Sequence, residues 1–248
     1  MRQSLHRRIK KTGLFGTRSR LLSFCGGVIF LIGILPAVII LALRWLPPPT
    51  TAFMLESQLT SLLSERPQPI RYQWTPWPEI SPHLPLAVLA AEDQKFLRHW
   101  GFDFDSIAKA MESNKKGKQL RGASTISQQV AKNLFLWPGR SYLRKGLEAY
   151  FTVLIELLWP KKRILEIYVN IAQFGDGIFG AHAAATSIFR KKPVALRAGE
   201  AALLAAVLPN PLVLKAHKPS SYVLERKRWI MGQMRQLNGP AHLQGLAP

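Results

Sequence analysis

The sequence has one cysteine, Cys25, and few acidic residues. A single thiol excludes an intrachain disulfide, so the fold must rest on its core. A chain of 248 residues suits one domain of about 200 residues plus extra segments, which is large enough to bury such a core. The 14 acidic residues stand against 34 basic ones, and the formal net charge of +20 predicts an anionic partner. Nucleic acid, anionic lipid and a phosphate-bearing substrate all qualify.

The sequence also lacks the usual signatures of nucleotide and metal sites. It contains no Walker loop, and its six histidines are scattered without metal-ligand spacing. It shows no internal repeat, no low-complexity tract and no convincing pair of strands. A mainly α fold is therefore expected.

The basic residues gather at the N-terminus. Residues 1–20 carry seven basic side chains and no acid, and Leu21 to Leu43 are uncharged and mostly apolar. About 20 such residues cross a bilayer as a helix, and a basic flank stays cytoplasmic. We predict a basic tail at 1–20, a single transmembrane anchor at 21–46 and an exported domain at 47–240. The alternatives are a buried helix of a soluble protein and a cleaved signal peptide, which has a shorter apolar region.

This topology leaves nucleic acid as a remote partner and favours the membrane. The predicted location is the inner membrane, with a cytoplasmic N-terminus and a periplasmic domain.

The exported part reads as successive helices, whereas residues 52 to about 80 are weakly patterned. Ser81 is a plausible N-cap, with Pro82 at the first helical position and an apolar run that leads into Glu92. Asp105 and Ser124 are candidate caps of the next two helices. Further helices are predicted at Leu143 to Trp159, Lys161 to Ala172, Ala183 to Phe189, Gly199 to Leu208 and Ser221 to Gln236.

Glu92 and Asp93 stand together at the end of an apolar helix, beside Phe96 and His99. A carboxylate held against apolar groups has a raised pKa and is useful for proton transfer. The alternative is an ordinary solvated pair at a helix end. The residues alone favour the solvated pair.

A polar helix face follows, on which Thr125, Gln129 and Lys132 lie four and three residues apart. Such a face suits phosphate or sugar oxygens near a helix N-terminus, although it also suits a hydrophilic surface. Arg144 and Glu148 form either a surface ion pair or a second site carboxylate with its cation. Glu166 and Asn170 repeat that spacing, and a structural hydrogen-bonded pair is equally compatible with it.

Five motifs together resemble the peptidoglycan glycosyltransferases of the glycosyltransferase 51 family. The motifs stand in family order across residues 86–211. They are Glu92-Asp93-Gln94-x-Phe96-x-x-His99-x-Gly101-Phe102-Asp103, then Gly122 to Leu134 around Thr125 and Gln129, then Arg144-Lys145-x-x-Glu148, then Lys162 to Gly180, and finally Glu200 to Pro211. The chain ends soon after the fifth motif, so it is similar to monofunctional members without a transpeptidase domain.

The resemblance implies a lysozyme-like α fold and lipid II as the substrate, together with the growing glycan chain. It implies Glu92 and Glu148 as catalytic residues. It implies substrate-binding roles for Asp93, Phe96, His99, Thr125, Gln129, Lys132, Asn133 and Arg144. It also suggests a Mg²⁺ or Mn²⁺ ion, with Glu148 as a possible ligand, and other cell-wall synthesis or division proteins as possible partners.

Two other functions stay open. A lytic transglycosylase or lysozyme-like hydrolase would also use a glutamate in an α fold, but would leave Lys132, Arg144 and Glu148 idle. A non-catalytic membrane scaffold would tolerate loss of Glu92.

Overall fold

The computed structural model describes residues 26–27, 30–65, 67–115, 123–139 and 141–246. It divides into two compact units, Met1–Leu43 and Arg44–Pro248, and each is described by itself. The predicted basic tail lies outside the described residues, as does part of the predicted anchor, residues 21–25 and 28–29.

In the first unit, a π-helical turn, η1 (Phe30–Ile34), leads into helix α2 (Leu35–Leu43). Both consist of apolar residues and glycine, apart from Pro36. Within the described stretches of the chain, no helix is long and apolar enough to span a bilayer.

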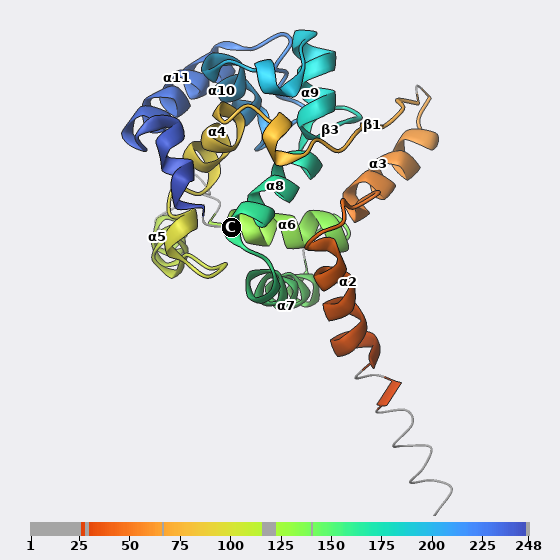
Figure 1. The fold of residues 1–248 in the computed structure, drawn as a ribbon. Helices are drawn as coiled ribbons and strands as arrows, with labels where there is room; N and C mark the ends of the chain where they lie inside the picture. The colour runs from red at the N-terminus through yellow and green to blue at the C-terminus, as the bar shows by residue number, and fades with distance from the viewer. Residues whose placement is uncertain (1–25, 28–29, 66, 116–122, 140, 247–248) are drawn as a thin grey trace, which may run out of the picture. The chain divides into compact units, whose positions relative to one another are not determined.

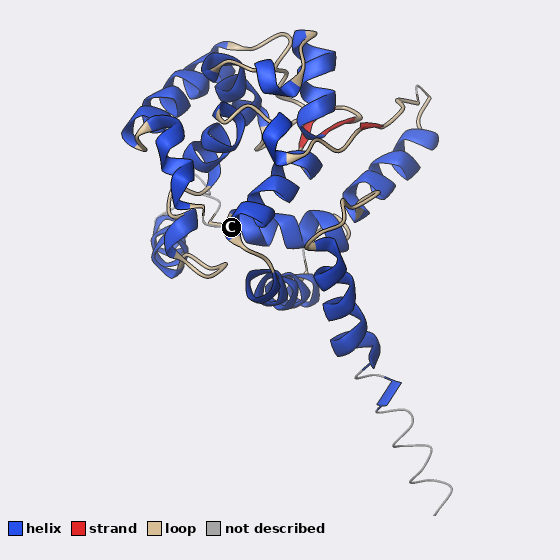
Figure 2. Cartoon of the chain, in the orientation of Figure 1, coloured by secondary structure: helices blue, strands red, loops and turns tan. Residues whose placement is uncertain are grey.

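The second unit is mainly helical, as predicted (Figure 2). Its α-helices are α3 (Ala52–Leu62), α4 (His83–Glu92), α5 (Phe104–Lys115), α6 (Ile126–Phe135), α7 (Tyr142–Leu158), α8 (Lys161–Ile171), α9 (Gly180–Phe189), α10 (Ala198–Val207) and α11 (Ser221–Gln236). Short 3₁₀ segments lie at η2 (Trp77–Glu79), η3 (Phe96–Arg98), η4 (Pro193–Ala195) and η5 (Gly239–Gly245). The helices predicted from residue 81 onward are present, with ends that differ by a few residues.

Two expectations were wrong. Residues 52–62 form helix α3, which begins at Thr51, whose side chain accepts a hydrogen bond from the Met54 N–H. The chain also contains a small sheet of order β1-β3-β2, formed by Arg71–Tyr72, Ile178–Phe179 and Gln173–Gly175. Strand β1 runs parallel to β3, and β2 runs antiparallel to it.

Helix α4 lies at the centre of the core and carries Glu92 at its C-terminal end. It is apolar on all sides and buried from Leu84 to Ala90, which is typical of a helix enclosed by others. It packs against α8, α10 and α11 (Figure 1). The alanines of α10 are buried and small, so its backbone can lie close to α4. The position of Glu92 is therefore set by the best-packed part of the fold.

Helix α6 carries the second motif and packs against α3, α7 and α8. Its buried positions include Ile126, Val130, Ala131 and Leu134, so one face is core and the other is free to be polar. The ends of α4 and α6 meet at the site described below.

Glu166 and Asn170 on α8 prove to be structural. Asn170 is fully buried, and its side chain bonds both the N–H and the C=O of Thr75. Glu166 accepts the Trp77 N–H at 2.8 Å and pairs with Arg163 at 2.7 Å. These contacts fasten the segment before α4 to the core, so the structural alternative for this pair holds.

Candidate active site

Glu92 is the last residue of α4, and its carboxylate meets side chains from two other helices. Its Oε2 accepts a hydrogen bond from Nε2 of Gln129 on α6 at 3.1 Å. Its Oε1 lies 3.4 Å from Nη2 of Arg226 on α11. The side chain is 16% exposed, so the carboxylate is held in place and still reachable from outside.

The surroundings of Glu92 favour a proton acceptor. Burial raises the pKa of Glu92 above its ordinary value. The hydrogen bond from Gln129 and the charges of Arg226 and Lys132 lower this pKa in part, while the charge of Asp93 raises it. A general base needs both features, namely a pKa raised toward neutrality and enough positive charge nearby to stay ionised.

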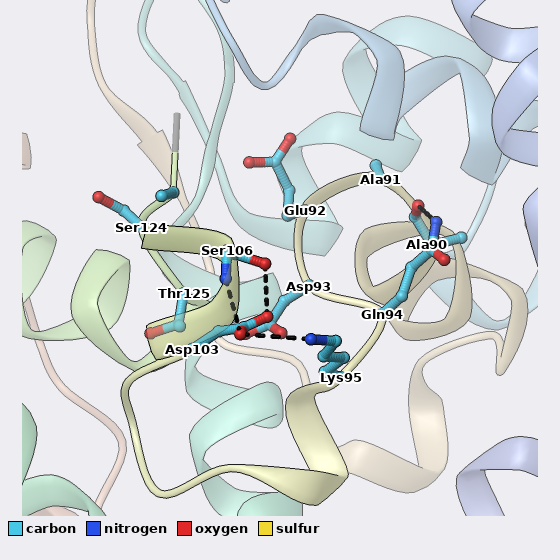
Figure 3. Close-up of a pocket in the computed structure, with 11 residues that line it drawn as sticks. Ala90, Ala91, Glu92, Asp93, Gln94, Lys95, Asp103, Ser106, Ser124 and Thr125 are labelled. Atoms are coloured by element: carbon cyan, nitrogen blue, oxygen red, sulfur yellow. Dashed lines mark hydrogen bonds and ion pairs between the residues drawn. The ribbon is translucent and has the colours of Figure 1, made fainter. Parts of the chain in front are cut away.

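A cleft of about 300 Å³ opens beside Glu92. Figure 3 shows the residues that line it, which are Ala90, Ala91, Glu92, Asp93, Gln94, Lys95, Asp103, Ser106, Ala123, Ser124 and Thr125. In this view Glu92 and Asp93 point in different directions. On the cleft floor, Asp103 accepts hydrogen bonds from the N–H and the hydroxyl of Ser106 and faces Lys95 at 3.4 Å.

Asp93, unlike Glu92, forms hydrogen bonds that hold the fold together. Nε2 of His99 lies 2.9 Å from Oδ1 and 3.1 Å from Oδ2 of Asp93. Oδ2 also accepts the backbone N–H of Ile126, the first residue of α6, at 3.0 Å. Asp93 therefore ties the end of α4 to the start of α6, and a carboxylate at a helix N-terminus is stabilised there. Its role in binding substrate stays a prediction.

Phe96 and His99 hold the loop that follows α4. Phe96 is buried, with Nζ of Lys161 4.4 Å from its ring centre and the His99 ring edge-on at 6.2 Å. The same Lys161 Nζ donates to the His99 carbonyl at 2.7 Å. Neither aromatic ring lines the cleft beside Glu92. Their substrate-binding roles are untested, and the contacts here are structural.

Thr125 also turns inward, which corrects the expectation that Ser124 caps α6. Thr125 is the N-cap: its hydroxyl accepts the Gln128 N–H, and the Gln128 side chain accepts the Thr125 N–H in return. The Thr125 hydroxyl donates to the Gly101 carbonyl at 2.6 Å. Ser124 is exposed at the rim of the cleft. Thr125 thus serves the cap and also lines the cleft, and its role in binding substrate stays a prediction.

A cluster of cations is formed by Lys132 of α6 with Arg144 and Lys145 of α7. Nη1 of Arg144 is 3.3 Å from Oε2 of Glu148, and Nζ of Lys145 bonds the other oxygen. Glu148 is 3% exposed, so its charge is balanced by these two neighbours rather than by water. Burial lowers the pKa of Lys132, while the charges of Glu148 and Glu92 raise it and that of Arg144 lowers it. Lys132 therefore links the two carboxylates electrostatically.

Two buried atoms in this cluster have no hydrogen-bond partner among the described residues. They are Oδ1 of Asn133 and Nε of Arg144. A buried polar atom without a partner is costly, so such atoms often mark a place that a ligand completes. Lys132, Asn133 and Arg144 were all predicted to bind substrate. The structure places Lys132 and Arg144 near Glu148, and Asn133 follows Lys132 on α6, which packs against α7.

The residues around Glu148 do not make a metal site by themselves. Both of its oxygens are engaged by Arg144 and Lys145. Across the described part of the chain, no three His, Cys, Asp or Glu side chains come together as a ligand set. The expectation of Mg²⁺ or Mn²⁺ stays a prediction.

Sequence reasoning missed two residues at Glu92. Tyr168 donates its hydroxyl to Oε1 of Gln129 at 3.0 Å, and burial raises the pKa of Tyr168 well above its ordinary value. The phenol therefore stays protonated and orients the Gln129 amide, whose NH₂ then faces Glu92. Tyr168 stands in the fourth motif, so the resemblance contained a signal for it. Arg226 lies beyond all five motifs, and only its place on a basic helix hinted at a role.

The arrangement suits displacement of an anionic leaving group by a weak nucleophile. The raised pKa of Glu92 suits a proton acceptor, and a separate set of cations suits stabilisation of negative charge. A hydroxyl nucleophile and a phosphate-bearing leaving group would use both sets.

Comparisons with known proteins agree with this chemistry. A family model described as Transglycosylase matches residues 58–235. The biosynthetic peptidoglycan transglycosylase of Pseudomonas savastanoi pv. phaseolicola is 56% identical over 209 residues, which cover 84% of this chain and 89% of that protein. The protein of the same name from Pseudomonas syringae pv. syringae is 52% identical over 246 residues, which cover 99% and 98%. These matches confirm the resemblance, and the chain belongs to the transglycosylase family and is a glycosyltransferase.

Proposed function

We propose that this enzyme polymerises lipid II into β-1,4-linked glycan strands and releases undecaprenyl diphosphate. The relatives matched over most of the chain are named biosynthetic peptidoglycan transglycosylases, which supports peptidoglycan as the polymer. The proposal includes a lysozyme-like arrangement of the helices and glycan polymerisation without transpeptidase activity.

The observation that carries the proposal is the pairing of two sets of groups. Glu92 lines a cleft, and its pKa is raised. The charge of Lys132 interacts both with Glu92 and with the Arg144–Glu148 pair. A hydrolase of the same polymer needs the carboxylate, but it has no lipid diphosphate to stabilise. The buried cations on α6 and α7 therefore favour a synthase over a lytic enzyme.

In the proposed reaction, Glu92 is the general base. It accepts the proton of the 4-hydroxyl on the acceptor's N-acetylglucosamine, whose oxygen attacks the anomeric carbon of the terminal N-acetylmuramic acid of the growing chain. The bond from that carbon to the lipid diphosphate breaks, and its electron pair leaves with the diphosphate. One direct displacement inverts the α-linked donor to a β-linked product.

Lys132 and Arg144 stabilise the charge that develops on the diphosphate. An Arg fork matches phosphate oxygens, and a preorganised cation lowers the barrier without reorganisation. The unpartnered Nε–H of Arg144 is available to donate to a phosphate oxygen, and Oδ1 of Asn133 can accept from a sugar hydroxyl or amide. Glu148 acts as the counter-ion that positions Arg144, because its carboxylate pairs with that guanidinium at 3.3 Å. Gln129 positions Glu92 itself.

The proposed location is the outer side of the inner membrane, behind a single anchor at residues 21–46. The uncharged run after a basic tail supports an anchor. Helix α7 supports contact with lipid, since Leu143, Val153 and Leu157 are exposed while Ile155 and Trp159 are core. A substrate with a lipid tail is confined to the bilayer surface, so a tethered enzyme meets it more often.

A polymerisation assay tests the proposal. The full chain in detergent, given labelled lipid II, should yield glycan strands and free lipid diphosphate. A parallel incubation with purified cell-wall sacculi should release no soluble muropeptides. Release of muropeptides without any polymer from lipid II would favour the lytic alternative, and neither activity would favour the scaffold.

A further inference from the structure

Helix α11 presents two exposed aromatic side chains that the proposed reaction does not use. Tyr222 is 56% exposed and Trp229 is 48% exposed. They lie two helical turns apart, which is about 10.5 Å along the axis. Each ring therefore has a face open to a ligand.

These rings share one side of α11 with the two residues that reach the active site. Tyr222, Arg226, Trp229 and Gln233 follow at spacings of four, three and four residues, which places them along a single helix face. Arg226 contacts Glu92 at 3.4 Å, and Gln233 accepts a hydrogen bond from the Gln94 side chain at 3.0 Å. Both Glu92 and Gln94 line the cleft. The aromatic rings therefore alternate with side chains that touch the cleft wall.

The side of α11 next to this face is core. Val223, Ile230 and Met234 are buried against the fold, and α11 packs on α4 and α10 along the outside of the molecule (Figure 1). This packing fixes the helix and with it the direction of the aromatic side. The Ser220 hydroxyl accepts the Val223 N–H and caps the helix start.

We infer that this face of α11, defined by Tyr222 and Trp229, is a binding subsite for the sugar rings of the glycan strand outside the cleft. Sugar rings carry faces of C–H groups that pack on aromatic rings, and their hydroxyls need polar partners. Glu225 and Gln236 are exposed beside the rings and offer a carboxylate and an amide. The spacing of the two rings is comparable with one disaccharide unit of a β-1,4-linked strand.

We take the ligand of this face to be the glycan strand, because the face is continuous with the cleft. A polymer that reacts at Glu92 must leave the cleft along some surface, and the aromatic face begins where Arg226 and Gln233 meet the cleft wall. The inference rests on the proposed function, because it takes the polymer to be glycan.

Binding of lipid-free strands tests the inference separately from catalysis. The full chain in detergent is titrated with soluble β-1,4-linked N-acetylglucosamine oligomers and with lipid-free glycan strands, by calorimetry. The double variant Tyr222→Ala, Trp229→Ala should bind them about tenfold more weakly, since each ring contributes a stacking contact. Trp229→Phe should keep most of the affinity, because it retains a ring.

Trp137→Ala is the matched control, since Trp137 is 50% exposed on a different part of the fold. It should bind the oligomers as the unchanged protein does. A second readout is the length of glycan made from lipid II, which should be shorter in the double variant.

Unchanged oligomer affinity in the double variant would overturn the inference, as would an equal loss in Trp137→Ala. Loss of binding to anionic vesicles in place of oligomers would assign the face to lipid and also overturn it. Failure of the unchanged protein to polymerise lipid II would instead contradict the proposed function, and the oligomer titration would still report on the subsite.

Discussion

Two glutamates on either side of Lys132, Glu92 on α4 and Glu148 on α7, have different surroundings. Glu92 is 16% exposed, accepts one amide hydrogen bond and has a guanidinium at 3.4 Å. Glu148 is 3% exposed and is bonded by both Arg144 and Lys145. Burial raises the pKa of Glu92, whereas Glu148 is held by two positive charges.

The difference teaches how two identical side chains take separate roles. A carboxylate with a raised pKa and an open side can accept a proton, and a carboxylate enclosed by cations serves as a fixed charge. The sequence motifs contain both glutamates without distinguishing them, so the difference in proposed role follows from the side chains around each one. The following changes test this contrast.

The largest effect is expected from Glu92→Gln. Removing a general base should lower the polymerisation rate about 10²- to 10⁴-fold, since such catalysis contributes that range. The folded pKa of Glu92 is raised, so its ionisation destabilises the fold as pH rises through that pKa. The melting temperature at pH 7 should therefore be equal or higher in the variant, and this gain should vanish at pH values below the ordinary pKa of glutamate.

The matched control is Glu79→Gln, because Glu79 is exposed and lies outside the cleft. It should leave both rate and melting temperature unchanged. Retention of full activity in Glu92→Gln would remove Glu92 from the role of base.

Glu148→Gln should behave in the opposite way with respect to stability. It leaves the guanidinium of Arg144, which is 12% exposed, without its carboxylate. Loss of one partner from this largely buried pair should lower the free energy of unfolding by about 2–3 kcal/mol. This is less than for a fully buried pair, because Lys145, the other partner of Glu148, is half exposed. Urea unfolding of the variant measures this cost.

Lys145→Ala provides the comparison, since removing the half-exposed partner should cost less than about 1 kcal/mol. If Glu148→Gln proved as stable as the unchanged protein, the two glutamates would not differ as described.

Arg226→Met should shift the pH dependence of the reaction. The charge of Arg226 lowers the pKa of Glu92, so its removal raises that pKa further. The base then becomes ionised only at higher pH, and the acidic limb of the rate profile should move upward, with a few-fold loss of rate at pH 7. Arg226→Lys should move the limb less.

Arg228→Met is the control on the same helix, because Arg228 is exposed and does not share the face of Arg226. An identical profile for Arg226→Met and the unchanged protein would show that the ion pair has no influence on the base.

The smallest effect is expected at the start of α6. Thr125→Ala removes the cap and should cost about 1 kcal/mol, within the usual range for an N-cap. Ser124→Ala, one residue earlier, should change the unfolding free energy by less than about 0.5 kcal/mol, since Ser124 is exposed. Equal costs would put the cap back at Ser124, where the sequence placed it.

The helices from residue 81 onward could be predicted because their signals are local. Helix α11 was placed at Ser221–Gln236 from its own residues, and α7 from its apolar spacing. Helix α3 was missed although Thr51 caps it and Leu55, Leu59 and Leu62 recur at helical spacing. These leucines are exposed in the structure. The sheet was missed because β1 and β3 pair over only two residues, far apart in sequence.

Only the site residues that lie within the five motifs could be predicted from the sequence. The resemblance named Glu92, Gln129, Lys132, Arg144 and Glu148, which the structure connects through contacts and charges, while their roles stay predictions. It could not tell which polar residues face inward. Asp93 and Thr125 are bonded within the fold, a distinction that depends on helix ends meeting in space. Arg226 is 134 residues from Glu92, and nothing local marks a pairing at that separation.

Asp93 also gives the site a mechanical property. Because its carboxylate holds the first N–H of α6, the residue next to the base is fastened to the helix that carries Gln129 and Lys132. This bond couples the end of α4 to the start of α6, and so restrains the spacing between Glu92 and Lys132. An inhibitor that displaced Glu92 would have to break this hydrogen bond. Compounds that fit the cleft in its present shape avoid that cost.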